Sequence, residues 1–173
     1  MRWQYSGKYI LMNILTTILI TMLLCQNTAW AKVSVDLVRV LKSEHKLQLI
    51  ANGKVWKEFN VALGSNPKGH KQQEGDGRTP EGNYTLNNKN DDSGYYKAIH
   101  ISYPNRADVK AAKARGVSPG GGIMIHGQKK KFGWLSPFSQ QFDWTKGCIA
   151  LTDEDMEVVW SKVEEGTRIE ILP

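Results

Sequence analysis

The dipeptide Asn52-Gly53 separates two runs in which apolar and polar side chains alternate. The first run covers Lys46 to Ala51 and the second covers Lys54 to Leu63. Alternation with a period of two is typical of a half-buried β-strand, and Asn-Gly tolerates the positive φ angles that a type I′ turn requires. This stretch therefore predicts a β-hairpin, which restricts the chain to folds that contain an antiparallel sheet.

Further strands are expected on both sides of the hairpin. They are short runs of strand-forming residues bounded by Gly, Asn, Pro or Asp. These runs cover Val33 to Val40, Asn83 to Asn87, Tyr95 to Tyr103, Gly121 to Ile125 and Thr167 to Leu172. The polar stretch between Gly64 and Gly82 predicts a long ordered loop, and loops of that length are usually functional in a compact domain.

Two short helices complete the predicted domain. The Ala- and Lys-rich segment from Asn105 to Arg115 ends before Gly116 and predicts the first helix. The second begins at Thr152, ends at Gly166 and has apolar residues at helical spacing. Those residues are Met156, Val159, Trp160 and Val163. The sequence therefore predicts one mainly β domain over residues 32–173.

Residues 1–31 have the three parts of a secretory signal peptide. Arg2 and Lys8 give a positive start, Ile10 to Leu24 is apolar, and Ala29-Trp30-Ala31 is a small-x-small cleavage pattern. The apolar run of about 15 residues is shorter than a membrane span, so we expect cleavage, with an uncleaved anchor as the alternative. The expected location is the periplasm or the cell envelope.

The composition excludes several classes of protein. Of 173 residues, 40% are hydrophobic, 16 are Gly and 6 are Pro, which is ordinary for a globular domain and unlike a disordered chain or a coiled coil. The formal net charge of +6 comes without a nucleic-acid motif, so we expect no nucleic-acid partner. No Cys/His cluster has metal-ligand spacing, and no phosphate-binding glycine loop opens a helix. We therefore expect neither a metal nor a cofactor.

Cys148 and His126 are the candidate catalytic pair. Cleavage of the signal peptide would remove Cys25 and leave Cys148 as the only cysteine. A thiol becomes an effective nucleophile when a base takes its proton, and histidine is the usual base. Gly147 allows backbone conformations that let neighbouring amides face an oxyanion. From the residues alone, an inert buried cysteine and a core histidine remain the alternative.

Four segments, which follow one another in the family's order along the chain, resemble the catalytic domain of the L,D-transpeptidase family (YkuD type). His126-Gly127 and Thr145-Lys146-Gly147-Cys148-Ile149 are similar to the family's His-Gly or His-Ser pair and its Ser/Thr-His-Gly-Cys motif. Residues 75–84 resemble the element G-x-x-x-T-P-x-G-x-Y. The hairpin followed by Val61-Ala62-Leu63-Gly64 is also similar, so that the resemblance spans roughly residues 33 to 173.

The resemblance implies a mixed β-sandwich or barrel with two short helices that acts on the peptide stems of peptidoglycan. Cys148 would hold a tetrapeptide stem as a thioester and pass it to an amine of another stem or of a wall-anchored protein. His126 would be the base, with its imidazole fixed by the Gly127 carbonyl. The amides of Gly147 and Cys148 would form the oxyanion hole. We expect a monomer.

Two positions depart from the family pattern and leave alternatives open. Lys146 stands where the family most often has His, and Ala150 stands where it most often has Arg. Without that guanidinium, a bidentate contact to a carboxylate is missing. One alternative is an L,D-carboxypeptidase or amidase-type hydrolase with the same Cys-His site. The other is a wall-binding module without catalysis.

Five residues are candidates for binding the substrate, namely Thr145, Lys146, Arg78, Trp134 and Trp144. Arg78 could reach a carboxylate in the cleft, and the two tryptophans flank the Cys-His region and could line a groove. A surface role for the arginine and core packing for the tryptophans are the alternatives.

Overall fold

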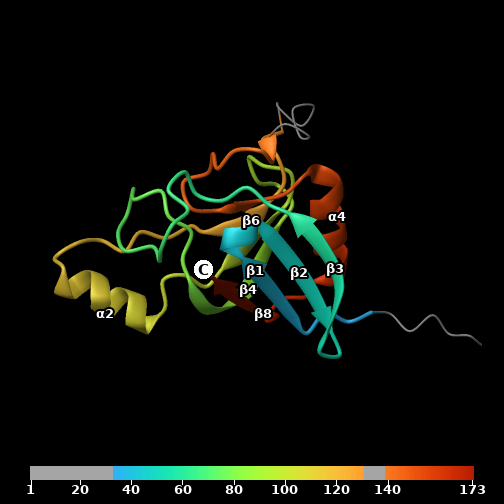
Figure 1. The fold of residues 1–173 in the computed structure, drawn as a ribbon, viewed down its shortest axis with the longest axis horizontal. Coiled ribbons are helices and arrows are strands. Elements are labelled where there is room, and N and C mark those ends of the chain that lie inside the picture. Colours follow the sequence, from blue (N-terminus) through green and yellow to red (C-terminus); the bar gives the residue numbers. More distant parts are fainter. Residues whose placement is uncertain (1–32, 131–138) are drawn as a thin grey trace, which may run out of the picture. The chain divides into compact units, whose positions relative to one another are not determined.

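Eight strands form one curled sheet in the computed structural model, which describes residues 33–130 and 139–173 (Figure 1). The strands are β1 (Leu37–Leu41), β2 (Lys46–Ala51), β3 (Lys54–Asn60), β4 (Gly82–Asn90), β5 (Ala98–Ile101), β6 (Met124–His126), β7 (Ile149–Ala150) and β8 (Arg168–Leu172). Their order in the sheet is β3-β2-β1-β8-β4-β5-β6-β7. The predicted signal peptide and Trp134 lie outside the described residues.

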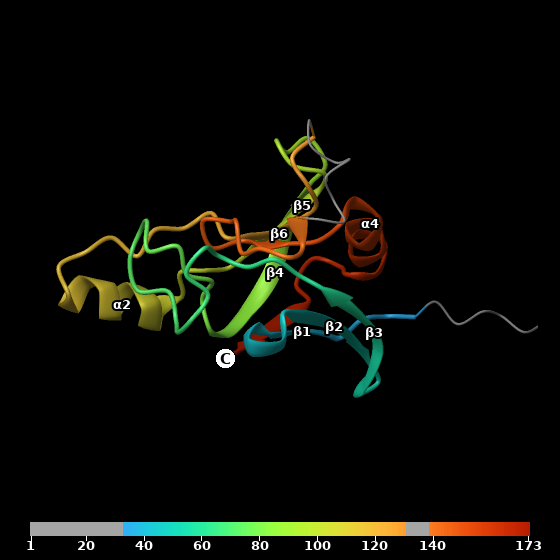
Figure 2. The ribbon, with the colours of Figure 1, turned by 45° about the horizontal axis from the view of Figure 1, so that its top comes forward.

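The predicted hairpin is confirmed as β2 and β3. Asn52 and Gly53 connect them with φ angles of 52° and 71°, as the type I′ turn requires. The second strand is shorter than predicted, because the chain leaves β2 after Asn60. The buried residue Ala62 then pairs with Ala150 of β7. This bridge joins the two ends of the strand order and curls the sheet into a half-barrel (Figure 2).

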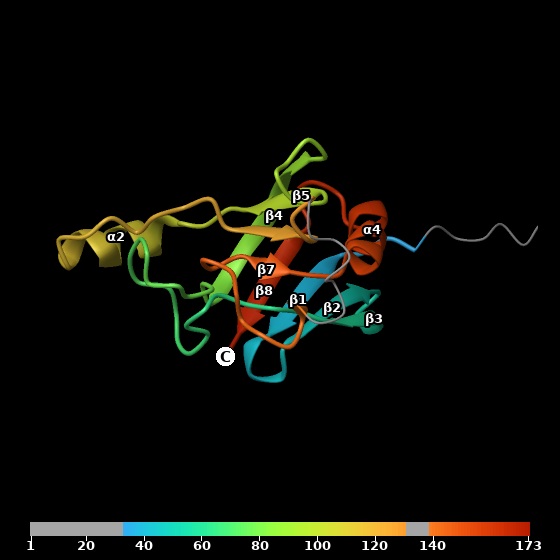
Figure 3. The ribbon, with the colours of Figure 1, turned by 90° about the horizontal axis from the view of Figure 1, so that it is seen from above.

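The two predicted helices are also present, as α2 (Arg106–Ala114) and α4 (Asp153–Lys162). Thr152 caps α4 by accepting a hydrogen bond from the Asp155 amide at 3.1 Å. α4 packs on the sheet through Met156, Val159 and Val163, which are at most 1% exposed. α2 lies at the opposite end of the domain (Figures 1 and 3). A short 3-10 turn, η1 (Lys42–Glu44), follows β1.

The fold is mainly β with two helices, as predicted, and its sheet is mixed. β1 pairs with β8 in parallel, and β6 pairs with β7 in parallel, whereas the other pairs are antiparallel. The short β7 had no signal in the sequence, because two residues are too few to show a period. Within the described ranges, no helix has both the length and the apolar character needed to cross a bilayer.

Candidate active site

His126 ends β6, and Cys148 directly precedes the neighbouring parallel strand β7. Ile125 of β6 lies opposite Ile149 of β7, and His126 lies opposite Ala150. Side chains alternate along a strand, and opposed residues share a face of the sheet. His126 and Cys148, which directly precedes β7, therefore project from the same face. Ile125 and Ile149 project from the other face and are fully buried in the core.

The tautomer of His126 follows from its contact with Gly127. The Nδ1 atom lies 2.6 Å from the Gly127 carbonyl oxygen, which can only accept a hydrogen bond. Nδ1 therefore carries the proton, and the neutral ring keeps its lone pair on Nε2. The imidazole is 1% exposed. Burial lowers the pKa of His126 to about 4, although the Gly127 contact opposes this shift. The ring is therefore a neutral base at pH 7.

Two aromatic side chains, which also contact each other with 6.4 Å between their centroids, pack against the imidazole. The Tyr95 ring stacks on His126 with 4.0 Å between the centroids, and Trp144 meets the imidazole edge-on at 5.9 Å. The backbone also fixes the ring's position, because the Gly127 amide donates to Tyr96 O at 2.8 Å and the Leu151 amide donates to His126 O at 2.9 Å. Trp144 thus contacts the imidazole, and its role in substrate binding stays a prediction. Tyr95 was not predicted to lie beside the imidazole, because nothing local distinguishes it from other strand tyrosines.

The Cys148 side chain is partly exposed. Burial raises the pKa of Cys148, whereas the Met124 amide and the positive charge of Lys71 oppose that increase. At pH 7 the sulfur is therefore protonated. Among the described residues, the thiol hydrogen bond goes to Gly122 O at 3.7 Å rather than to His126. Catalytic hydrogen bonds often form only when substrate is bound.

The loop before Cys148 differs from the expectation in two respects. Thr145 is only 4% exposed, and its hydroxyl accepts from the Gly147 amide at 3.1 Å and donates to Cys148 O at 2.7 Å. Thr145 therefore positions the loop, and its hydroxyl is engaged there. The Gly147 amide, which was expected to contribute to an oxyanion hole, donates its hydrogen bond within the same loop. Gly147 has a φ of +125°, and a Cβ there would lie 2.6 Å from Arg78 O.

A polar cleft of about 570 Å³ lies next to the Cys148 loop, because Lys146, two residues before Cys148, lines it. It is lined by Lys71, Glu74 and Lys146, by Ser65, and by glycine backbone. Lys146 is exposed and faces this cleft, where a substrate contact was predicted. Arg78 does not line it. The Arg78 guanidinium instead donates to His70 O at 3.4 Å, so the predicted carboxylate contact by Arg78 is not supported.

The sequence did not single out Lys71, because its neighbours are polar loop residues with no motif of their own. Lys71 and Lys146 line the same cleft only because the folded loop brings them there. Within the part of the chain that the structure describes, no group of three or more His, Cys, Asp or Glu side chains is arranged to hold a metal ion.

The curled mixed sheet, with a histidine that ends one strand and a cysteine that directly precedes the neighbouring parallel strand, defines a class of protein that sequence comparison also identifies. The family model of the L,D-transpeptidase catalytic domain (YkuD) matches residues 35–171. The chain belongs to this family.

Individual relatives agree with that assignment. The Escherichia coli (strain K12) protein named "Putative L,D-transpeptidase YafK" is 33% identical over 112 residues, which are 61% of this chain and 44% of that protein. The helical cell shape determining protein Pgp2 from Campylobacter jejuni has a similar structure, with a TM-score of 0.61 and 29% identity. That match covers 79% of this chain and 47% of Pgp2. The chain therefore spans less than half the length of YafK and of Pgp2.

A more distant structure shares the fold alone. An L,D-transpeptidase from Mycobacterium smegmatis is 17% identical with a TM-score of 0.54, over 82% of this chain and 59% of that one.

Proposed function

We propose that this protein is an exported cysteine L,D-transpeptidase that acts on peptidoglycan stems. The observation that supports this most directly is the neutral imidazole of His126, with Nδ1 bound to Gly127 O and the lone pair on Nε2, on the same face of the sheet as Cys148. Membership in the family supplies the reaction class. The polar cleft that Lys146 lines, two residues before Cys148, provides room for a peptide.

The proposed reaction begins from the neutral pair. Nε2 of His126 takes the thiol proton while Sγ of Cys148 attacks the carbonyl carbon between the third stem residue and the terminal D-Ala. The Cys148 amide stabilises the resulting oxyanion. When the C–N bond breaks, His126 returns the proton to the departing amine of D-Ala. The stem remains bound to Cys148 as a thioester.

The second half of the reaction transfers the stem. An amine of a neighbouring stem, or of a wall-anchored protein, attacks the thioester carbon and gives its proton to His126. The C–S bond then breaks, and the proton returns to the sulfur. Both half-reactions use the same base, as expected for acyl transfer through a covalent intermediate.

The proposal places the enzyme in the periplasm or cell envelope, with residues 1–31 as a cleaved signal peptide and residues 32–173 as the catalytic domain. The test is intact-mass measurement of the protein recovered from the envelope fraction. A mass that begins at Lys32 is the expected result. Recovery of the full chain from the membrane would instead favour an anchor.

A hydrolase is the second candidate, because this chain lacks the arginine at position 150. Ala150 is fully buried and pairs with Ala62, so the cleft has no guanidinium there to hold a stem. With water in place of the amine, the same thioester would yield a tripeptide stem.

Incubation of the purified protein with tetrapeptide muropeptides tests both candidates. Cross-linked dimers detected by mass spectrometry are expected for the transpeptidase, whereas tripeptide alone would favour the hydrolase. Cys148→Ala, checked for folding by circular dichroism, should form neither product. If this variant keeps full activity, the thiol mechanism is wrong.

A carbapenem separates an enzyme from a wall-binding module. We expect a covalent adduct on the wild-type protein and none on Cys148→Ala. If neither a carbapenem nor a mild alkylating agent modifies Cys148, the binding module becomes the better description.

A further inference from the structure

Lys71 is a buried lysine in the cleft beside the proposed active site. Its side chain is only 3% exposed, which is rare for lysine unless the charge is paired. Its ammonium donates to Asp76 Oδ1 at 2.7 Å and to Gln73 O at 3.1 Å. An ammonium has three donors, so these two contacts leave one N–H for a group in the cleft that Lys71 lines.

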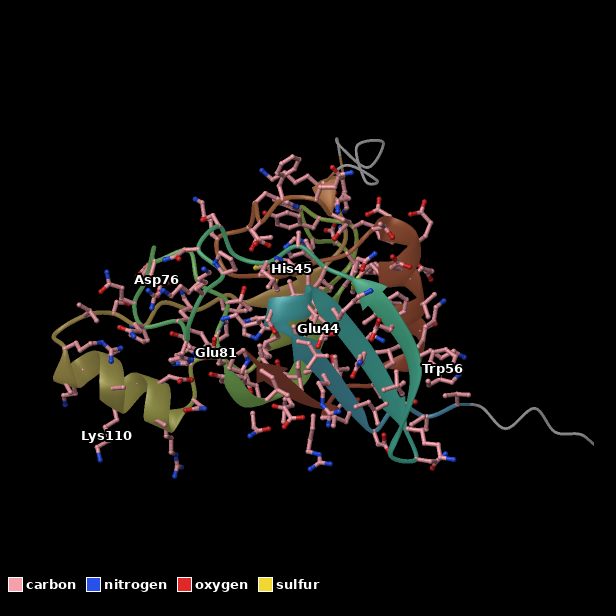
Figure 4. The ribbon with its side chains drawn as sticks, viewed as in Figure 1. Glu44, His45, Trp56, Asp76, Glu81 and Lys110 are labelled. Atoms are coloured by element: carbon pink, nitrogen blue, oxygen red, sulfur yellow. The ribbon has the colours of Figure 1, made fainter. Side chains whose placement is uncertain are left out.

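Asp76 fixes the position of this ammonium. It comes from the loop between β3 and β4 and is labelled in Figure 4. Burial alone would raise the pKa of Asp76, but hydrogen bonds from Lys71 and from the backbone of Gln72, Arg78 and Gln73 lower it to about 2. The carboxylate is therefore ionised at all pH values above that range, and it holds the loop closed around Lys71. Asp76 is thus a positioning residue.

The glycine segment that lines this cleft continues to the residue that accepts the thiol hydrogen bond. Gly120 and Gly121 line the cleft and lead to Gly122, whose carbonyl accepts the Cys148 thiol hydrogen bond. The positive charge of Lys71 interacts with Cys148 and favours the thiolate form of its sulfur. Lys146, two residues before Cys148, lines the cleft as well.

Two of the three charged side chains that line this cleft are positive. Glu74 is the acidic residue that lines it, and its Oε2 accepts a hydrogen bond from the Ser118 hydroxyl at 3.1 Å. The arginine that the family most often has at position 150 is absent, and Arg78 is directed to His70 O. Lys71 and Lys146 are therefore the cations that line the cleft within the described residues.

We propose that Lys71 and Lys146 bind the terminal carboxylate of the donor peptide, one residue beyond the bond that Cys148 cleaves. This inference rests on the proposed function, because it names the group that the site recognises. It makes Lys71 a determinant of specificity for peptides that end in a free carboxylate directly after the scissile amide. A fixed, partly desolvated ammonium suits this role, because ordering it costs little when the ligand binds.

The test compares two peptides, a tetrapeptide stem with a free terminal carboxylate and the same stem with a terminal carboxamide. A hydrogen bond to a charged group corresponds to roughly a 10- to 100-fold preference, so wild-type kcat/KM should favour the acid by about that factor. Lys71→Met should bring the ratio of acid to amide close to one. A merely structural role for Lys71 would lower both values equally and leave the ratio unchanged.

Two controls accompany this test. Lys68→Met removes an exposed lysine of the same loop that does not line the cleft, and it should leave the ratio unchanged. Circular dichroism checks the folding of Lys71→Met. If that variant does not fold, the ratio of kcat/KM values for acid and amide in the wild-type protein still tests the inference. Equal turnover of the two peptides overturns the inference and leaves the proposed function intact.

If the wild-type protein processes neither peptide, the proposed function fails and binding to Cys148→Ala decides the role of Lys71. Calorimetry would then have to show tighter binding of the acid than of the amide, and loss of this difference when Lys71→Met is added. Equal binding of the two peptides, or no binding, overturns the inference.

Discussion

Replacing His126 with Asn should remove a specific part of the pH dependence of stability. Asn keeps an N–H that can reach the Gly127 carbonyl, but it does not titrate in the acid range. In the wild-type protein, burial lowers the pKa of His126 from 6.5 to about 4. Above pH 6.5 the ring is neutral in both the folded and the unfolded state, so it adds no pH dependence there.

The sign of the effect below pH 6.5 follows from proton uptake. Between pH 6.5 and 4 the unfolded chain binds a proton on His126 that the folded protein excludes. The free energy of unfolding therefore falls as the pH falls, and the loss is complete below the folded pKa. One pKa unit corresponds to about 1.36 kcal/mol, so the wild-type protein should lose about 3 kcal/mol more than His126→Asn.

Urea unfolding at a series of pH values from 7 to 4 measures this difference. Other titrating groups contribute to both curves and cancel when the two are subtracted. His126→Gln serves as a second non-titrating replacement, in case Asn alters the local packing. NMR titration of the four histidines measures the pKa of His126 independently. One imidazole signal should titrate near pH 4, and that signal should be absent from the spectra of both variants.

Two results would refute the reasoning. One is a pair of stability curves that stay parallel between pH 7 and 4. The other is an NMR signal assigned to His126 that titrates near 6.5. Either result would mean that water reaches the His126 ring and that burial does not lower its pKa.

Three further predictions concern packing and reactivity. Gly127→Ala should destabilise the protein by about 1–3 kcal/mol in thermal unfolding, because the new Cβ would lie 2.6 Å from Asp153 Oδ1. The control Gly94→Ala should be nearly neutral in the same assay, because a Cβ there meets no atom within 4 Å. Met156→Ala empties a fully buried position and should cost about 2–5 kcal/mol in urea unfolding; a loss under about 1 kcal/mol would contradict the packing described. The alkylation rate of Cys148 should still rise above pH 9.0, because burial raises its pKa from that value, and a plateau below pH 8 would show a preformed thiolate instead.

Local patterns were sufficient for much of the fold. Asn52-Gly53 predicted the hairpin, because the φ preferences of two adjacent residues decide that turn. The spacing of Met156, Val159 and Val163 predicted the buried face of α4, because the helical period is a property of a short segment of chain. The family resemblance pointed to His126 and Cys148 through short sequence motifs alone.

Predictions that depended on partners elsewhere in the chain were less successful. The strand expected to run to Leu63 ends at Asn60, because residues 61–63 leave β2 and meet the strand that follows Cys148. Thr145 was expected to face substrate, but its hydroxyl is used by the loop that it belongs to. Neither outcome follows from hydrophobic period or turn type.

By itself, the amino-acid sequence determined most of the strands and both helices, because neighbouring side chains and backbone preferences decide these, and its short motifs pointed to the two residues of the proposed chemistry. Only the tertiary structure decided that Tyr95 stacks on His126 and that Lys71, rather than Arg78, faces the cleft beside Cys148. Such contacts join residues that are far apart along the chain. They depend on how the loops pack on the closed sheet, and no local pattern contains that information.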